Sequence, residues 1–128
     1  MRPTLEGLRE AGLTVVVAGN QPARRRRQLV DLGLPADVIA TSDDLGVDKP
    51  APGYFARVCA LAGAPPERVL HVGDRVDNDV VPARHAGLRT AWLRRGPWGL
   101  LQRPPVDGPP DLMLVALSEL ADHLGVRA

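Results

Sequence analysis

Residues 69–79 read Val-Leu-His-Val-Gly-Asp-Arg-Val-Asp-Asn-Asp, and this stretch decides how the rest of the chain is interpreted. Its apolar first half predicts a buried strand, which three carboxylates, Asp74, Asp77 and Asp79, follow directly. An acidic cluster of this kind suits Mg²⁺, which prefers oxygen ligands. The alternative is that the loop is solvated and that Asp79 caps a helix ending near His85.

Apolar runs that predict strands alternate with helical patterns along the chain. The predicted strands are residues 13–18, 37–41, 69–73, 90–93 and 112–115, and the predicted helices are residues 3–12, 22–32, 55–62, 79–86 and 118–124. This alternation predicts an α/β fold, a three-layer α/β/α sandwich with a mainly parallel sheet and its chemistry at the carboxyl ends of the strands. The length of 128 residues predicts a single domain, 1–128, with a Pro/Gly-rich loop at 96–110 that acts as a tether.

Composition narrows the class of protein. The chain is 45% hydrophobic and 24% charged, with a formal net charge of +1, so nothing favours nucleic acid or an anionic membrane as a partner. Arg24–Arg27 is a basic run, but four successive helical residues cannot share one face, which favours a solvated surface. Cys59 is the only cysteine, so the chain can form no internal disulfide, which suits a reducing compartment. No apolar stretch approaches the length of a membrane helix. A cytoplasmic location is therefore expected.

Lys49 is the only lysine among 16 basic residues. Arginine serves wherever the chain needs positive charge, so a solitary lysine indicates a place that requires a compact point charge. A leftover surface lysine is the alternative.

A second candidate site is the turn after the first predicted strand. Gly19 and Asn20 end this strand just before a helix, where backbone N–H groups favour an anion such as phosphate. An ordinary turn is the competing interpretation for this pair.

Taken together, these three segments resemble the haloacid dehalogenase-like hydrolase superfamily. Residues 15–20 are similar to its second motif, Lys49 within residues 46–50 to its third, and residues 71–79 to its fourth. The resemblance covers about residues 3–99 and implies a Rossmann-like core with Mg²⁺-dependent phosphatase chemistry.

The resemblance also implies a role for each site residue. Asp74 would be a magnesium ligand, and Asp79 a supporting carboxylate for the metal or the lysine. Lys49 would neutralise the phosphoryl group of a phosphorylated small molecule and the nucleophile, while Gly19 and Asn20 would bind a phosphate oxygen. The implied mechanism is attack by an aspartate on phosphorus, followed by hydrolysis of the aspartyl-phosphate.

The sequence departs from the family pattern in two places. Gly19 stands where the second motif normally has Ser or Thr, so one side-chain hydrogen bond to phosphate is lost. The first motif, a strand followed by Asp-x-Asp, is missing, because residues 1–14 contain no aspartate. Residues 77–81 match the pattern, but they lie inside the fourth motif, so the match is interpreted as accidental. The chain is expected to lack both nucleophile and cap, to bind Mg²⁺ weakly and to be inactive alone.

The missing strand has a structural consequence. In the family it lies between the strands at Val15 and Val69, so we expect these two strands to pair directly, or a strand from another chain to fill the gap. The partner would be a second copy or an N-terminal segment supplied in trans. Two other functions stay open: a non-catalytic binding module that dimerises through exposed sheet edges, and a dehalogenase-like hydrolase that needs no metal.

Overall fold

The structure is a computed structural model that describes residues 2–95, 101–103, 105 and 108–125. The helices are α1 (Arg2–Glu10), α2 (Ala23–Asp31), α3 (Ser42–Leu45), α4 (Pro52–Ala62), α5 (Val81–His85) and α7 (Glu119–His123). The strands are β1 (Val16–Gly19), β2 (Val38–Thr41), β3 (Leu70–Gly73), β4 (Arg89–Leu93) and β5 (Leu112–Leu114). A 3₁₀ turn, Pro66–Arg68, precedes β3, and a π-helical turn, Val76–Val80, leads from β3 into α5.

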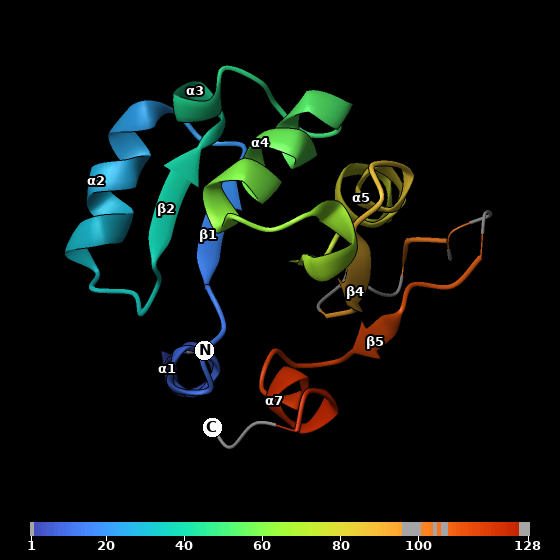
Figure 1. The fold of residues 1–128 in the computed structure, drawn as a ribbon. Coiled ribbons are helices and arrows are strands. Elements are labelled where there is room, and N and C mark those ends of the chain that lie inside the picture. Colours follow the sequence, from blue (N-terminus) through green and yellow to red (C-terminus); the bar gives the residue numbers. More distant parts are fainter. Residues whose placement is uncertain (1, 96–100, 104, 106–107, 126–128) are drawn as a thin grey trace.

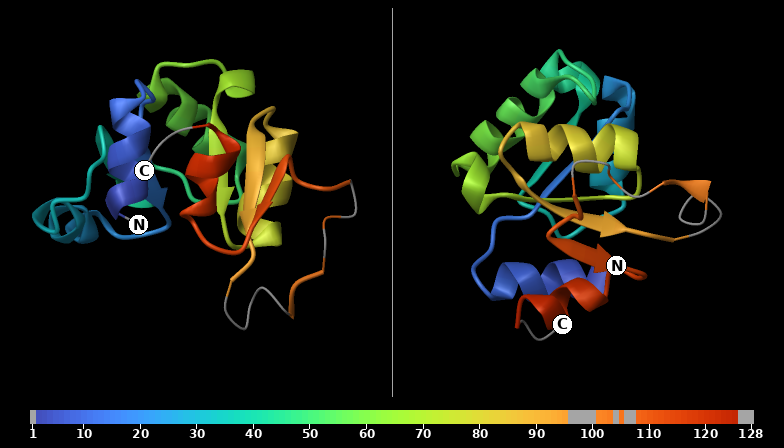
Figure 2. Two further views of the ribbon diagram at one scale, coloured as in Figure 1. Left: turned by 90° about the horizontal axis from the view of Figure 1, so that it is seen from below. Right: turned by 90° about the vertical axis from the view of Figure 1, so that its right-hand side faces the viewer.

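The predicted α/β class and parallel strands are confirmed. The helices α1 and α7 cover one face of the strands, and α4 and α5 cover the other (Figure 2). One core cluster lies on the α4 side, around Tyr54, Phe55 and Val58, and a second lies on the α1 and α7 side, around Leu8 and Leu120. Cys59 is buried in the first cluster.

The strands form two parallel sheets rather than one. In the described residues β1 pairs with β2, and β3 pairs with β4, which in turn pairs with β5 (Figure 1). Of the two alternatives predicted for the strands at Val15 and Val69, direct pairing is therefore wrong, and a strand from another chain between them stays a prediction. The residues of β1 and β3 are all only half-buried, which is unusual for apolar strands inside an α/β layer. The ladder edges of β1 and β3 that β2 and β4 leave open thus have no strand partner within the described part of the chain.

Two local predictions are corrected by hydrogen bonds. Residues 42–45 form the short helix α3 instead of a plain loop, because Thr41 and Asp44 make a reciprocal capping box: the Asp44 amide donates to Thr41 Oγ1, and the Thr41 amide donates to Asp44 Oδ2. Asp79 does not cap α5; it lies inside the π-helical turn, and its side chain turns back over β3.

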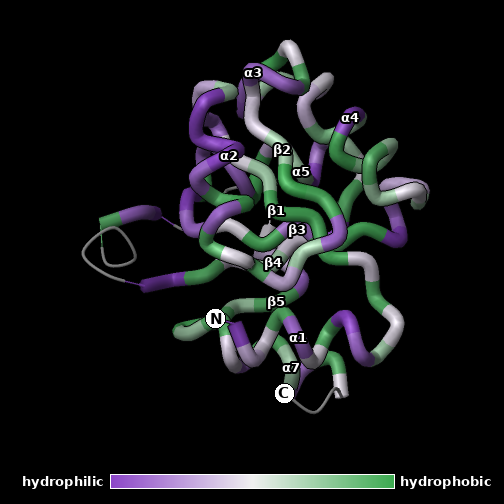
Figure 3. The backbone as a smooth tube through the Cα atoms, turned by 90° about the vertical axis from the view of Figure 1, so that its left-hand side faces the viewer, coloured by the Kyte–Doolittle hydropathy of each residue, from purple (hydrophilic) through white to green (hydrophobic). Residues whose placement is uncertain are grey.

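Helix α2 lies at the outer edge of β2 and buries no residue (Figure 1). Even the apolar residue Val30 is 53% exposed. The four arginines Arg24–Arg27 are all exposed, and Arg26 pairs with Asp44 at 3.3 Å. Figure 3 shows the resulting hydrophilic helix beside the hydrophobic strands.

Part of the loop predicted at 96–110 lies outside the described residues. The described part is not a simple tether, since Gln102 contacts the loop after β3 and the Arg84 guanidinium donates to the Pro109 carbonyl at 3.1 Å. No helix in the described ranges is both long enough and apolar enough to cross a membrane.

Candidate active site

The segments that follow β1 and β3 meet through the Lys49 loop. Asn20, just after β1, binds the backbone of Lys49 twice: its Nδ2 donates to the Lys49 carbonyl at 3.1 Å, and its Oδ1 accepts from the Lys49 amide at 2.8 Å. The Lys49–Pro50 peptide bond is cis. An amide side chain that satisfies both backbone groups of one residue fixes that residue in place. Asn20 therefore positions Lys49, and its expected contact with phosphate stays a prediction, as does that of Gly19.

A second pair of hydrogen bonds holds the turn after β1. Ser42 Oγ accepts from the Gln21 amide at 3.1 Å and donates to the Gln21 carbonyl at 3.1 Å. Nearby, Asp43 Oδ2 accepts from the Ala23 amide at 2.9 Å, at the start of α2. Ser42 thus has a structural role in this turn.

The Lys49 side chain reaches across to Asp79. Its ammonium lies 2.7 Å from Asp79 Oδ1, and the two side chains are only 15% and 5% exposed. His71 Nε2 lies 2.9 Å from the same oxygen, and the Arg75 amide donates to Asp79 Oδ2 at 3.2 Å. His71 is thus a residue of β3 whose ring contacts the site carboxylate. Lys49 and Asp79 lie 30 residues apart in the sequence, and the fold brings them into one ion pair.

Burial works against ionisation of Asp79, but the hydrogen bond from His71 and the charge of Lys49 outweigh it, so the pKa of this carboxyl lies below its usual value. Asp79 is therefore ionised at neutral pH. The ring of Tyr54 lies under the lysine, with the ammonium 5.9 Å from its centroid. Burial, followed by the negative charge of Asp79, raises the pKa of the Tyr54 hydroxyl.

The lowered pKa of Asp79 gives a test of the ion pair in acid. A carboxyl whose pKa is depressed by folding contributes stability above its unfolded pKa of about 4, and that stability is lost as the pH falls through the folded pKa. We expect the free energy of unfolding to fall between pH 5 and pH 2.5, and to fall less in Asp79→Asn. Denaturant titrations at both pH values measure this difference, with the exposed residue Asp31→Asn as control. An equal acid dependence in wild type and Asp79→Asn would contradict the assignment.

Asp74 begins the loop after β3 and is exposed. Gln102 holds the backbone of this loop, since its Nε2 donates to the Asp74 carbonyl at 2.6 Å and its Oε1 accepts from the Val76 amide at 2.6 Å. Asp77 is paired with Arg75 at 2.8 Å. Gln102 was missed by the sequence analysis, because a contact that spans 28 residues leaves no periodic or motif signal.

The donors predicted for Mg²⁺ do not form a complete site by themselves. Asp79 already accepts from Lys49, His71 and the Arg75 amide, and the described residues gather no three metal-binding side chains at one point. Mg²⁺ takes several oxygen ligands in near-octahedral geometry. Asp74 is the exposed carboxylate that remains for such an ion, so the metal-ligand roles of Asp74 and Asp79 stay predictions.

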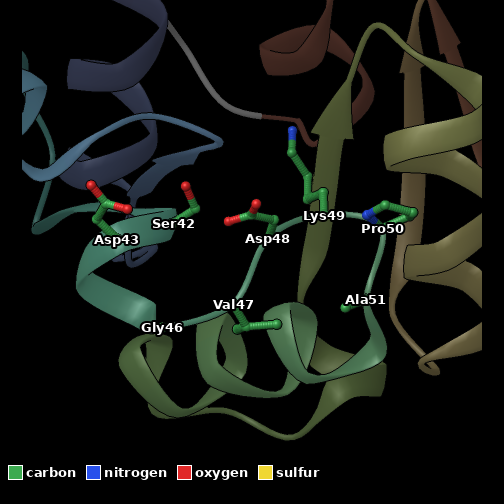
Figure 4. A pocket seen from close by; sticks show the side chains of 8 residues that line it. All are labelled: Ser42, Asp43, Gly46, Val47, Asp48, Lys49, Pro50 and Ala51. Carbon is green, nitrogen blue, oxygen red and sulfur yellow. The ribbon is translucent and has the colours of Figure 1, made fainter.

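A shallow depression of about 570 Å³ borders the Lys49 loop (Figure 4). Its lining residues are Ser42, Asp43, Gly46, Val47, Asp48, Lys49, Pro50 and Ala51. Asp48 lies between Ser42 and Lys49, while the lysine side chain extends away from the floor of the depression (Figure 4). Asp43 and Asp48 in the lining disfavour an anion on the floor of this depression.

Known proteins resemble this chain over most of its length. Residues 1–87 match the haloacid dehalogenase-like hydrolase family. The chain is 32% identical over 123 residues to the glyceraldehyde 3-phosphate phosphatase of Methanopyrus kandleri, covering 94% of this chain and 53% of that protein. It is 33% identical over 115 residues to the phosphoserine phosphatase of Thermus thermophilus, covering 88% of this chain and 45% of that protein.

Two solved structures show the same fold. A HAD phosphatase from Thermococcus onnurineus superposes with a TM-score of 0.83 at 31% identity, over 96% of this chain and 55% of that chain. A 2-haloacid dehalogenase from Pseudomonas syringae pv. Tomato superposes with a TM-score of 0.77 at 29% identity, over 98% and 51%.

A parallel α/β core with a lysine, its partner carboxylate and an acidic loop at the carboxyl ends of the strands defines a Rossmann-like hydrolase core. The chain belongs to the haloacid dehalogenase-like hydrolase family. It spans about half the length of the curated relatives it matches.

Proposed function

We propose that this chain supplies the cationic part of a phosphate-ester hydrolase site, in which Lys49 neutralises the charge of the phosphoryl group. The observation that carries this proposal is the fixed position of the Lys49 ammonium between β1 and β3. An ammonium has three N–H donors, and the ion pair with Asp79 uses one of them. The other donors suit phosphate oxygens, and the phosphatase names of the relatives support the same chemistry.

Membership of a family with phosphatase relatives supports the following reaction. A carboxylate oxygen attacks phosphorus, the bond from phosphorus to the ester oxygen breaks, and water then cleaves the acyl phosphate to release phosphate and restore the carboxylate. Lys49 stabilises the charge that the phosphoryl oxygens carry during both steps. Asp74 is the carboxylate that this chain offers to Mg²⁺, and we propose that one exposed carboxylate binds the ion only weakly.

We propose further that the site is completed by a strand that pairs with both β1 and β3 and carries the attacking carboxylate. The open ladder edges of these two strands support this, as does their half-burial. Unpaired ladder groups also favour association through sheet edges. A second copy of the chain could occupy the same edges without any nucleophile, which is the non-catalytic alternative. Light scattering separates the two, since a strict monomer opposes self-pairing.

Orthophosphate binding to the chain tests the role of Lys49 directly. Because Lys49 is the sole lysine, lysine labelled with ¹³C and ¹⁵N gives a single side-chain signal that can be followed during titration with phosphate. We expect this signal to move on binding, and Lys49→Met to lose binding. Phosphate binding that leaves the Lys49 signal unmoved, or that survives Lys49→Met, would contradict the proposal.

Gly19→Ser offers a gain of binding in the same titration. A Cβ at Gly19 has nothing closer than Gln21 Cγ at 3.9 Å, so the hydroxyl that the second motif normally carries can be accommodated. We expect tighter phosphate binding from one added hydrogen bond, worth about 1 kcal/mol or roughly fivefold in affinity. Gly53→Ala, whose Cβ also meets only ordinary contacts, is the matched control and should bind phosphate as the wild type does.

A dehalogenase is the second candidate, since the Pseudomonas syringae structure shares the fold. Dependence on Mg²⁺ separates the two activities, because a phosphatase of this family needs the ion and a dehalogenase does not.

A further inference from the structure

His71 shares an oxygen with the site lysine through Asp79. Asp79 Oδ1 lies 2.7 Å from Lys49 Nζ and 2.9 Å from His71 Nε2. Because Asp79 is ionised, its oxygens only accept hydrogen bonds, so His71 Nε2 must carry a proton in this arrangement. The Arg75 amide donates to Oδ2, so each carboxylate oxygen accepts a hydrogen bond from β3 or the loop that follows it.

The imidazole that provides this hydrogen bond is itself held by regular structure. His71 is the second residue of β3, and its side chain is 12% exposed. Phe55, a fully buried residue of α4, packs edge-on against the imidazole, with ring centroids 5.1 Å apart and an interplanar angle of 88°. A strand and a long helix thus orient the ring.

Asp79 belongs to the five-residue π-helical turn, where its amide donates to the Arg75 carbonyl at 2.9 Å. The Lys49 ammonium ends a flexible four-carbon chain and lies 5.9 Å from the centroid of the Tyr54 ring. The hydrogen bond from His71, on a strand, restricts Oδ1, the oxygen that Lys49 also contacts, while the Arg75 amide restricts Oδ2. His71 therefore helps to set where the ammonium lies.

We propose that His71 is a positioning residue for Lys49: its Nε2–H holds Asp79 Oδ1 so that the lysine ammonium is oriented before phosphate arrives. This inference rests on the proposed function, because an oriented Lys49 matters for binding only if the lysine binds phosphate. The geometry of the His71–Asp79–Lys49 chain stands independently of it. Ordering the ammonium beforehand removes an entropy cost from binding, so loss of His71 weakens phosphate affinity by about tenfold.

The sole lysine makes the test selective. In protein labelled at lysine, we expect the two Hε protons of Lys49 to be distinct and its side-chain relaxation to be slow, as in an immobilised side chain. His71→Leu should merge the Hε signals and speed the relaxation, and His71→Gln, which restores an N–H donor, should recover most of the wild-type signal. The exposed His123→Leu is the matched control and should change nothing. An unchanged Lys49 signal in His71→Leu would overturn the proposal.

If a His71 variant fails to fold, a measurement on the wild-type protein still tests the proposal. The ¹⁵N chemical shifts of labelled histidine report which ring nitrogen carries hydrogen, and we expect a protonated Nε2 for His71 at neutral pH. An Nε2 without hydrogen would overturn the proposal. Both NMR readouts are independent of phosphate, so ordered Lys49 with no phosphate response would reject the proposed function and leave the positioning role standing.

Discussion

Gly73→Ala is expected to lower the free energy of unfolding by about 3 kcal/mol, near the upper end for overpacking a well-packed site. A Cβ at Gly73 would overlap Cβ and Cγ of Asp79, whose side chain turns back directly over the end of β3. Asp79 cannot move away without a large cost in free energy, because Lys49, His71 and the Arg75 amide hold its carboxylate. The variant therefore either strains β3 or breaks the ion pair.

Gly53→Ala is the control for this substitution. It makes the same chemical change on α4, where the nearest atom to the new Cβ is Val47 Cγ2 at 3.8 Å. Alanine is favoured over glycine in a helix by about 0.5–1 kcal/mol, so this variant should be slightly more stable than wild type. Denaturant unfolding measures both. Equal stability of the two variants would show that Asp79 does not pack over Gly73.

Asp79→Ala is expected to lower the free energy of unfolding by about 3 kcal/mol, because it leaves the Lys49 ammonium and the His71 ring without their acceptor in a mostly buried place. Removing one partner of a buried pair costs more than removing both. The double variant Lys49→Met/Asp79→Leu should therefore be more stable than Asp79→Ala.

A double-mutant cycle between these positions measures the coupling, with Lys49→Met and Asp79→Leu as its single variants. We expect a coupling energy of about 1 kcal/mol or more, as for residues in one network. Additive effects would mean that the two side chains do not form an ion pair in solution.

The strands could be predicted because each is a short apolar run, and the helices because they carry apolar residues at helical spacing or Pro, Asp and Gly at their ends. Lys49 could be identified because it is the only lysine, and the loop after β3 because three carboxylates follow a buried strand directly. The capping box of Thr41 and Asp44 also leaves a signal in the sequence, the Thr-x-x-Asp spacing.

Other features left no signal that a single sequence could provide. The local sequence predicts Asp79 as a helix cap, because an aspartate before an apolar run usually is one, and only the family resemblance implies a carboxylate that supports the metal or the lysine. Its side chain is turned back by Lys49 and His71, which lie elsewhere in the sequence. Gln102 is one polar residue in a Pro/Gly-rich segment, and its two hydrogen bonds depend on the path of the whole chain. The division into two sheets likewise depends on which strands meet, and not on the pattern of any one strand.

Hydrolysis of an aryl phosphate with and without Mg²⁺ tests the central claim most directly. The assay compares this chain alone with the chain joined to the part of the Methanopyrus kandleri phosphatase that it does not match. We predict no turnover by the chain alone and Mg²⁺-dependent turnover by the joined protein, reduced by orders of magnitude in Lys49→Ala and Asp74→Asn. Turnover by the joined protein that survives Lys49→Ala, or Mg²⁺-dependent turnover by the chain alone that Asp74→Asn abolishes, would contradict the account.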